Sequence, residues 1–464
     1  MRIRARYAAA AGGLLFVVLF FTSQVEILTA VQKLNPKECS KTYYLAGDRV
    51  DAGYLRHVIK VFERAGYSRS YERDSWSVLW SHLYPFGDPP RKYYGDYLKS
   101  LPEDRRVNKI PGTGWISSKQ ALSKLVNYKY MPTAFELPSQ FNKFNDYAKS
   151  NPEGHWVVKS GKHRNIKIVE AKDFLKLRST KEQFVQRLVE PPMIIDRKKF
   201  DIGIYTVVTS IDPLRVYMLQ SEWLIRFCKD EYEPFDPNNV NSYVVGDDYT
   251  TIWDIPTLDA YMKNGSSMKQ ALLRHMKASG KDIEQFQLNF KEAVAQVWEL
   301  QREKILNVYK NYNVKEGQMF EMFRMDFVID EDANIFLLEV NMSPNLSSQS
   351  HPANAPIYES VLQNMFQLVG LTSTFIQAPW ETSFCNDETD LNCQKNPFCK
   401  KCLSPSQLNT VNKLTSEMLY RGNFELVSPS VHREPVLQQT FLDKFQLDFM
   451  KKYCEHDSRW CQIQ

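Results

Sequence analysis

Two runs of apolar residues, separated by a short polar turn, lie between positions 323 and 344. Val, Ile, Leu and Phe fill both runs, and the turn between them is Asp330 to Asn334. β-Branched and aromatic residues favour strands, whereas Asp and Asn favour turns. The pattern therefore predicts a β-hairpin, with its centre between residues 332 and 333.

This register brings two carboxylates face to face. Asp326 pairs with Glu339, residue 324 pairs with Asn341, and Asn341 lies on the same face as Glu339. Opposed carboxylates destabilise a sheet unless a positive charge lies between them. Carboxylate and amide oxygens are the ligands of a hard cation such as Mg²⁺. We therefore expect Asp326, Glu339 and Asn341 to bind Mg²⁺; the alternative is an edge hairpin with a solvated acidic face.

Hydrophobic periodicity elsewhere predicts a mixture of strands and helices. Short alternating or continuous apolar runs indicate strands, and apolar residues spaced three and four apart indicate helices. Pro- and Gly-rich breaks at 85–90, 110–114 and 132–138 place a domain boundary near the last of them. The predicted strands cover 75–83, 156–159, 166–169, 184–189, 200–210 and 214–219, and the predicted helices cover 52–72, 119–125, 290–306 and 355–371.

The N-terminus has the pattern of a secretory signal. Arginines at positions 2, 4 and 6 precede an uncharged, largely apolar run from 7 to 23. A basic flank before a short apolar run indicates a signal peptide or a signal anchor. No good cleavage site follows, so we expect a single-pass type II membrane anchor with the bulk of the chain in the lumen. The alternatives are cleavage near Ser23 or Ala30, or, if this segment is no signal, a chain in the cytoplasm and on the cytoskeleton.

Six of the eight cysteines fall between residues 385 and 461. A secretory signal and a local even number of cysteines predict disulfides. The alternative is that Cys399 and Cys402 form half of a zinc site, although no matching pair lies nearby. We therefore expect disulfides and assign no pairing.

Composition narrows the class of protein. The 464 residues are 43% hydrophobic and 13% aromatic, which indicates a folded chain of several domains and excludes a disordered one. The net charge of +5 is small for this length and does not suggest a nucleic-acid binder, although it suits an acidic protein partner.

Several charged residues are candidates for a nucleotide site. Transfer of a phosphoryl group from ATP needs positive charge on the phosphates and a metal that bridges them. Lys159 ends a predicted strand, and Arg164 lies in the polar loop 160–165 that follows, which resembles a flap over phosphate. Lys199 and Asp201 are two residues apart and so share one face of a strand, and Arg226 follows the next strand pair. Together with the three metal-ligand candidates, they supply the cations and oxygen ligands that a nucleotide needs.

Several segments, in this order and spacing, resemble the tubulin–tyrosine-ligase-like family, a branch of the ATP-grasp ligases. Met325-Asp-Phe-Val-Ile-Asp330 and Leu337-Leu-Glu-Val-Asn-Met-Ser-Pro344 resemble the family's magnesium-binding strands. Trp156-Val-Val-Lys159 is similar to the strand with its phosphate-binding lysine. Phe184-Val-Gln-Arg187 resembles the hinge whose backbone holds adenine, which adds Gln186 to the nucleotide-binding candidates. The likeness covers about residues 110 to 371.

The resemblance implies an α+β fold of the ATP-grasp type, with the nucleotide between two lobes. We expect a signal anchor and stalk at 1–35, a small N-terminal domain at 36–131, a central ATP-grasp lobe at 132–197, a C-terminal ATP-grasp lobe at 198–375, and a cysteine-rich tail at 376–464.

The resemblance also implies an ATP- and Mg²⁺-dependent ligase. Such an enzyme adds an amino acid, here expected to be glutamate, to protein side-chain carboxylates through an acyl-phosphate, as tubulin polyglutamylases do. The expected partners are free glutamate, a protein acceptor such as the C-terminal tails of tubulin, and the membrane through the anchor, with no nucleic acid. The resemblance assigns Lys159, Arg164, Gln186 and Lys199 to nucleotide binding, and Arg226 and Asp201 to catalysis.

The chain departs from the family pattern at three places. The family's Lys-Phe-Asp-x motif usually ends in Arg, but Gly203 stands there. Loss of one preorganised cation near the transferred phosphate commonly costs about 100-fold in rate. Asn165 replaces a usual Gly, and the segment Tyr243 to Asp248 replaces a His-Leu-Thr-Asn motif. These departures leave two alternatives open: a membrane-anchored nucleotide-binding pseudoenzyme or interaction module, and a kinase-like ATP-grasp enzyme that acts on another substrate.

Overall fold

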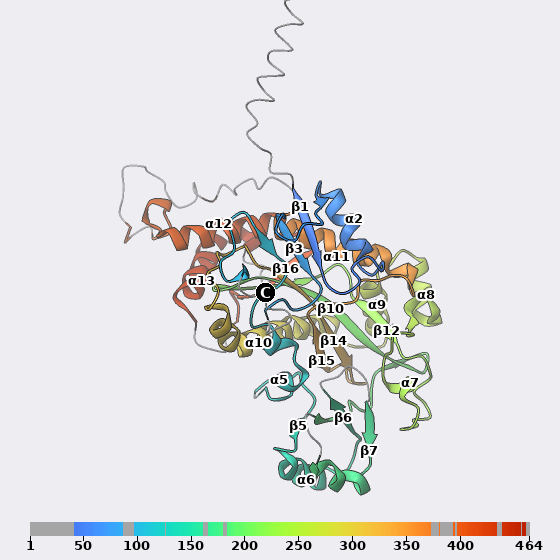
Figure 1. Cartoon of the computed structure of the whole chain (residues 1–464). Helices are drawn as coiled ribbons and strands as arrows, with labels where there is room; N and C mark the ends of the chain where they lie inside the picture. Colours follow the sequence, from blue (N-terminus) through green and yellow to red (C-terminus); the bar gives the residue numbers. More distant parts are fainter. Residues whose placement is uncertain are drawn as a thin grey trace, which may run out of the picture.

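The computed structural model has a mixed α+β architecture, as predicted (Figure 1). It describes residues 41–86, 97–125, 127–160, 166–179, 183–372, 380, 393–394, 397–433, 439–455 and 457–460. These residues form three β-sheets, and helices cover the largest of them.

The largest sheet is built around one long strand, β10 (Lys198–Ile211). One edge of β10 pairs with β12 (Leu224–Phe227) and then β11 (Leu214–Leu219), and its other edge pairs with β14 (Glu321–Ile329). All residues of β11 and β14 are buried, including the charged residues Arg215, Glu321, Arg324 and Asp326. The sheet is completed by β9 (Ile194–Ile195), β13 (Thr250–Thr251), β15 (Ile335–Asn341) and β16 (Phe424–Ser428).

The predicted hairpin is confirmed as the pair β14 and β15. Asp326 pairs with Glu339, and Arg324 pairs with Asn341, as the assumed register requires. Beyond Asp326, toward the turn, the register shifts by one residue. A β-bulge adds one residue to one strand and re-aims the side chains there. The prediction therefore holds at the end of the hairpin that carries the carboxylates and fails near the turn.

A smaller antiparallel sheet, in the order β5-β8-β6-β7, has a hydrophobic core of its own. Helix α6 (Phe141–Ser150) places Phe141 and Phe144 in this core, against Trp156 and Val185. In Figure 1 this sheet and α6 extend from the lower side of the molecule. The elements are β5 (Ala134–Leu137), β6 (Trp156–Ser160), β7 (Lys167–Val169), β8 (Gln183–Arg187) and the 3₁₀ segment η1 (Ala171–Ser179).

The third sheet is parallel, in the order β2-β1-β3-β4, and lies at the N-terminal side. Its helix α2 (Arg56–Arg64) packs on α11 (Ala355–Leu368), with the rings of Phe62 and Phe366 4.6 Å apart. Helix α2 is shorter than predicted because Gly66, at φ 81°, follows its C-cap in the left-handed conformation that ends helices. The remaining elements are β1 (Thr42–Ala46), β2 (Ser68–Arg69), β3 (Val78–Ser81), β4 (Arg106–Val107), α4 (Gly114–Ser117) and α5 (Lys119–Ser123).

The long helix α10 (Ile283–Tyr309) packs on the large sheet. It begins seven residues before the predicted start because Asp282 caps it, accepting hydrogen bonds from the backbone N–H groups of Glu284 and Gln285. Its buried stripe includes Phe290, Val294, Val297 and Ile305, as the periodicity predicts. Shorter helices precede it: α7 (Val240–Tyr243), α8 (Pro256–Lys263) and α9 (Met268–Ala278).

The C-terminal residues are part of the large sheet. Strand β16 pairs antiparallel with β11, and helices α12 (Pro405–Tyr420) and α13 (Phe441–Cys454) flank it. Capping boxes start both helices, with Ser404 and Gln407 at α12 and Thr440 and Asp443 at α13. In Figure 1 helices α12 and α13, in red, lie at the upper left of the molecule.

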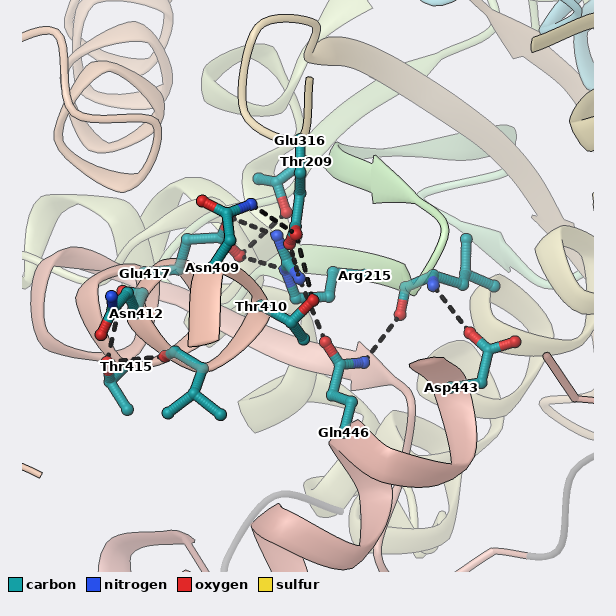
Figure 2. Close-up of polar contacts among 12 residues, drawn as sticks. Thr209, Arg215, Glu316, Asn409, Thr410, Asn412, Thr415, Glu417, Asp443 and Gln446 are labelled. Carbon is teal, nitrogen blue, oxygen red and sulfur yellow. Dashed lines mark hydrogen bonds and ion pairs between the residues drawn. The ribbon is translucent and has the colours of Figure 1, made fainter. Parts of the chain in front are cut away.

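A buried arginine joins the C-terminal helices to the sheet (Figure 2). Arg215 of β11 is 0% exposed, and its Nε and Nη2 donate to Glu417 of α12 at 2.8 and 3.1 Å. Its Nη1 donates to Gln446 of α13 at 3.1 Å and forms an ion pair with Glu316 at 2.5 Å. A buried charge is tolerated only when it is paired and hydrogen-bonded, so this network fixes α12 and α13 to the sheet.

The prediction of disulfides is confirmed in the described part of the tail. Cys393 and Cys402 form a disulfide with an S–S distance of 1.96 Å, and Cys399 and Cys454 are also disulfide-bonded. The zinc alternative for Cys399 and Cys402 is therefore wrong. Three other cysteines, Cys39, Cys385 and Cys461, lie outside the described residues.

Candidate nucleotide and metal site

Neighbouring strands of the large sheet bring six of the predicted site residues together. Strand β10 passes between β12 and β14, and β14 pairs with β15. Lys159 and Gln186 come from the smaller sheet, and Arg164 lies outside the described residues. The six are Lys199 and Asp201 on β10, Arg226 on β12, Asp326 on β14, and Glu339 and Asn341 on β15.

Arg226 links two carboxylates from different strands. It stands opposite Asp201 in the ladder and donates to it through Nε and Nη2 at 2.9 and 2.8 Å. The same Nη2 donates to Asp326 at 3.0 Å. Fork-shaped pairs of this kind are strong and fix the orientation of both side chains. Asp201 is therefore held against Arg226.

Asp326 receives a second guanidinium, from Arg324 on the same strand. Arg324 Nε donates to Oδ1 at 2.6 Å, and its Nη2 donates to Oδ2 at 2.8 Å. Asn341 adds a third donor, with Nδ2 2.9 Å from Oδ2. Asp326 is 3% exposed, so these donors replace the water that an exposed carboxylate would have.

Glu339 is held by a lysine that precedes it by more than 200 residues. Lys119 Nζ lies 2.5 Å from Glu339 Oε2, and Asn341 Nδ2 donates to the other oxygen at 3.0 Å. Burial alone would raise the pKa of Glu339, but Lys119, Asn341 and Arg324 outweigh it and hold the pKa below its usual range. The positive charge that opposed carboxylates require is thus supplied by Lys119, Arg226 and Arg324.

The two carboxylates and the amide fit a magnesium ion. Asn341 Nδ2 donates to both Asp326 and Glu339, so the two carboxylates converge on one point. The amide presents its oxygen there after a half-turn. Mg²⁺ in phosphate sites is bound by one or two carboxylates together with phosphate oxygens. In the described part of the chain, no group of three or more His, Cys, Asp or Glu residues is arranged to hold a metal ion.

Lysines border the carboxylates on the side of the smaller sheet. Lys159 Nζ donates to Gln186 Oε1 at 2.6 Å, and Gln186 is 2% exposed. Burial, and then the neighbouring charge of Lys119 and Lys199, lower the pKa of Lys159 to about 8, although Glu339 opposes the shift. Burial also lowers the pKa of Lys199, which lies 6.0 Å from the centroid of the Tyr232 ring. An anion bound among Lys119, Lys159 and Lys199 would offset the repulsion between their positive charges.

Two residues of this cluster were missed at the level of sequence. Arg324 lies two residues before Asp326, so the two-residue period of a strand places it on the same face. That signal was available and was not used. Lys119 lies on the short helix α5, and only the packing of α5 against β15 brings it to Glu339.

Known proteins resemble this chain over much of its length. A family model described as the tubulin-tyrosine ligase family matches residues 98–378. A Caenorhabditis elegans protein named probable tubulin polyglutamylase ttll-15 is 34% identical over 96% of this chain and 91% of its own length. Mouse tubulin polyglutamylase TTLL5 is 28% identical over 64% of this chain, and human tubulin monoglutamylase TTLL4 is 25% identical over 79%. The chain spans only 23% of the length of TTLL5 and 34% of that of TTLL4.

The prediction of a type II membrane protein with a lumenal bulk is contradicted. The relatives are named for the modification of tubulin, and none of these names refers to a membrane or a lumen. In the part of the chain that the structure describes, no helix is long and apolar enough to cross a membrane. Residues 1–35, which were predicted as the anchor and stalk, lie outside the described residues. A type II membrane anchor and a lumenal location of the chain are therefore not supported.

The family model covers more than half of the chain, including every described site residue. The alignment with ttll-15 runs along nearly the whole length of both proteins. The chain therefore belongs to the tubulin-tyrosine ligase family.

Proposed function

We propose that this protein is an ATP-dependent ligase that adds glutamate to side-chain carboxylates of a protein, with the C-terminal tails of tubulin as the acceptor. The observation that carries the proposal is the convergence of Asp326, Glu339 and Asn341 with a set of buried cations on strands that the family match covers. The relatives' names, polyglutamylase and monoglutamylase, support glutamate as the amino acid.

The reaction proceeds in two steps through an acyl-phosphate. An acceptor carboxylate attacks the terminal phosphorus of ATP, the bond to the β-phosphate oxygen breaks, and ADP leaves. The amine of free glutamate then attacks the acyl carbon, inorganic phosphate leaves, and the amine gives up a proton to solvent. Negative charge accumulates on phosphate oxygens in the first step, so fixed cations at that point stabilise its transition state.

The geometry of the cluster supports the following residue roles within this proposal. Asp326, Glu339 and Asn341 would hold Mg²⁺, which neutralises phosphate charge when it is bound. Lys159 and Lys199 would bind phosphate oxygens, and Gln186 of the hinge strand β8 would orient Lys159 by accepting its hydrogen bond. Arg226 of β12 donates to the proposed metal ligand Asp326, and Asp201 would orient Arg226. Arg164, which is also predicted to bind the nucleotide, lies outside the described residues.

Glutamate-rich acceptors also fit the charge of the protein. The chain has a net charge of +5, and the tails of tubulin are acidic. Complementary charge accelerates encounter more than it strengthens the final complex. We therefore expect the acceptor to bind faster at low salt than at high salt.

The pseudoenzyme alternative finds no support among the relatives, which are named as ligases. The ligase is tested by ADP release from the full chain with Mg²⁺, ATP, glutamate and tubulin. We expect rapid release only when glutamate and tubulin are both present, with glycine and tyrosine as weaker substitutes. ADP release that does not depend on glutamate would contradict the proposal, and Glu339→Gln serves as the inactive control.

A further inference from the structure

Gly203 and Arg324 share one space between β10 and β14. In the ladder Gly203 pairs with Asp326 and Tyr205 pairs with Arg324, so positions 203 and 324 are diagonal neighbours. A Cβ atom at position 203 would lie 2.8 Å from Arg324 Cδ and 3.2 Å from its Cγ and Nε. Carbon atoms that are not bonded do not approach this closely. A side chain at position 203 and Arg324 in its present position therefore exclude one another.

The backbone itself does not require glycine at position 203. Gly203 is absent from the described glycines with positive φ, and it lies inside a regular ladder. Glycine inside a strand is unfavourable unless another group must approach the backbone closely. Here that group is the side chain of Arg324, which lies across Gly203.

Arg324 brings its charge to the metal ligands. Its side chain is 9% exposed, and both of its hydrogen bonds to Asp326 point into the cluster. Arg226 binds the same carboxylate, so two guanidiniums share Asp326. Arg226 also pairs with Asp201, so the two guanidiniums are balanced by two carboxylates, and the excess positive charge that suits an anionic ligand comes from Lys159 and Lys199 nearby.

We propose that Arg324 supplies from β14 the guanidinium that the family's Lys-Phe-Asp motif supplies from position 203 of β10, and that it contacts the terminal phosphate of ATP. The guanidinium thus comes from the neighbouring strand β14, and glycine at position 203 leaves room for the side chain of Arg324. This inference rests on the proposed function, because it needs ATP to be the ligand. It removes the main objection to turnover, since the departure at Gly203 then leaves no cation missing.

Nucleotide binding tests the contact without turnover. Calorimetry on the full chain with Mg²⁺ compares ADP with a non-hydrolysable ATP analogue, in the natural protein and in Arg324→Gln. We expect the natural protein to prefer the analogue, and Arg324→Gln to lose most of that preference while its affinity for ADP changes less than about threefold. Arg324→Lys keeps the charge and should retain part of the preference. Equal weakening for both nucleotides would show that Arg324 is only a counter-ion of Asp326, and would overturn the proposal.

Exchange of the two residues tests the shared space. Gly203→Arg alone should lower the melting temperature and the turnover, because the new side chain collides with Arg324. Arg324→Gly alone should lower turnover about 100-fold, the typical effect of removing one preorganised donor. The double variant Gly203→Arg with Arg324→Gly should recover at least tenfold over Arg324→Gly and regain the melting temperature lost in Gly203→Arg. A double variant no better than the worse single variant overturns the proposal.

The two hypotheses fail in different ways. Nucleotide preference that depends on Arg324, without any glutamate-dependent product, would overturn the ligase and keep the assignment of Arg324. A ligase that is unaffected by Arg324→Gln would keep the function and overturn the assignment. A natural protein that binds neither nucleotide would overturn both.

Discussion

At the scale of single residues, the buried carboxylates of the site are paired with arginine and lysine side chains. Asp326 and Glu339 are opposed in the ladder, and arginine and lysine side chains compensate them. The pairing of these two residues agrees with the register assumed from the sequence, although the register at the turn differs from it by one residue and a β-bulge lies between the turn and the pair. The compensating cations were less predictable, because Lys119 reaches Glu339 from a segment 220 positions away.

Removal of one metal ligand should abolish magnesium-dependent binding of ATP. Glu339→Gln keeps the size of the side chain but removes its charge, and the fold should persist because Asn341 and Lys119 retain an amide oxygen as acceptor. We expect the affinity of ATP in the presence of Mg²⁺ to fall by more than the roughly 10–100-fold that loss of an outer-shell partner costs. Calorimetric titration of each protein with ATP in the presence of Mg²⁺ measures this affinity. The matched control is Glu331→Gln in the exposed turn of the same hairpin, and unchanged binding in Glu339→Gln would contradict the metal assignment.

The affinity for ATP should fall in alkaline solution. Burial lowers the pKa of Lys159 from 10.5 to about 8, and the facing groups are Lys119, Lys199 and Glu339. Below pH 8 Lys159 is charged in the folded and unfolded states, and the cost of burying the charge is present in full. Between about pH 8 and 10.5 the folded state loses its proton first, so this cost is relieved and stability from this group rises with pH.

Because phosphate binding needs the charged form, affinity should fall by up to about tenfold per pH unit above pH 8. Lys159→Arg remains charged and should bind ATP with a flatter pH profile. The profile is measured by calorimetry between pH 7 and pH 10. Identical profiles for the two proteins would mean that Lys159 does not contact the nucleotide.

At the scale of elements, strands with strong apolar patterns were predicted well. The predicted strand at 200–210 became β10, the predicted hairpin became β14 and β15, and the predicted helix at 355–371 became α11. Strand β16 was not predicted. Its five residues have no extended pattern of their own, and they form a strand because β11 offers a free edge. Such pairing is set by tertiary contact and not by local sequence.

The junction of α12 with the sheet should depend on one carboxylate. Glu417 accepts hydrogen bonds from Arg215, Thr209 and Tyr217, and it is 5% exposed. Removal of one partner of a buried ion pair typically costs about 3–5 kcal/mol. Glu417→Gln should therefore lower the midpoint of urea unfolding clearly. Glu455→Gln, which breaks an exposed pair with Lys452, should cost no more than about 1 kcal/mol, and equal effects in the two variants would contradict this account.

At the scale of the whole molecule, the catalytic sheet and the C-terminal segment are one structure. The family match ends at residue 378, but β16, α12 and α13 complete the large sheet beyond it. The predicted α+β class was therefore right, whereas no pattern in the residues after 400 predicted that they would join the sheet. Their cysteines indicated disulfides, and disulfides alone do not reveal which strand a segment joins.

A chain that ends at residue 378 should not fold stably. It would expose the edge of β11 and leave Arg215 without Glu417 and Gln446. An unpaired strand edge promotes aggregation, and a buried charge without its partners is costly. We expect the truncated chain to be insoluble or rapidly degraded by protease, with the full chain measured in parallel. A soluble truncated chain with protease resistance equal to that of the full chain would contradict the structural role of the tail.

The most direct test of the ligase is mass spectrometry of the acceptor. The full chain is incubated with tubulin, ATP, Mg²⁺ and isotopically labelled glutamate, beside Glu339→Gln and a reaction without ATP. The account predicts tubulin tail peptides heavier by one or more labelled glutamate residues, only in the natural protein and only with ATP. Unmodified tubulin after incubation with a folded protein that binds ATP would contradict the proposed function.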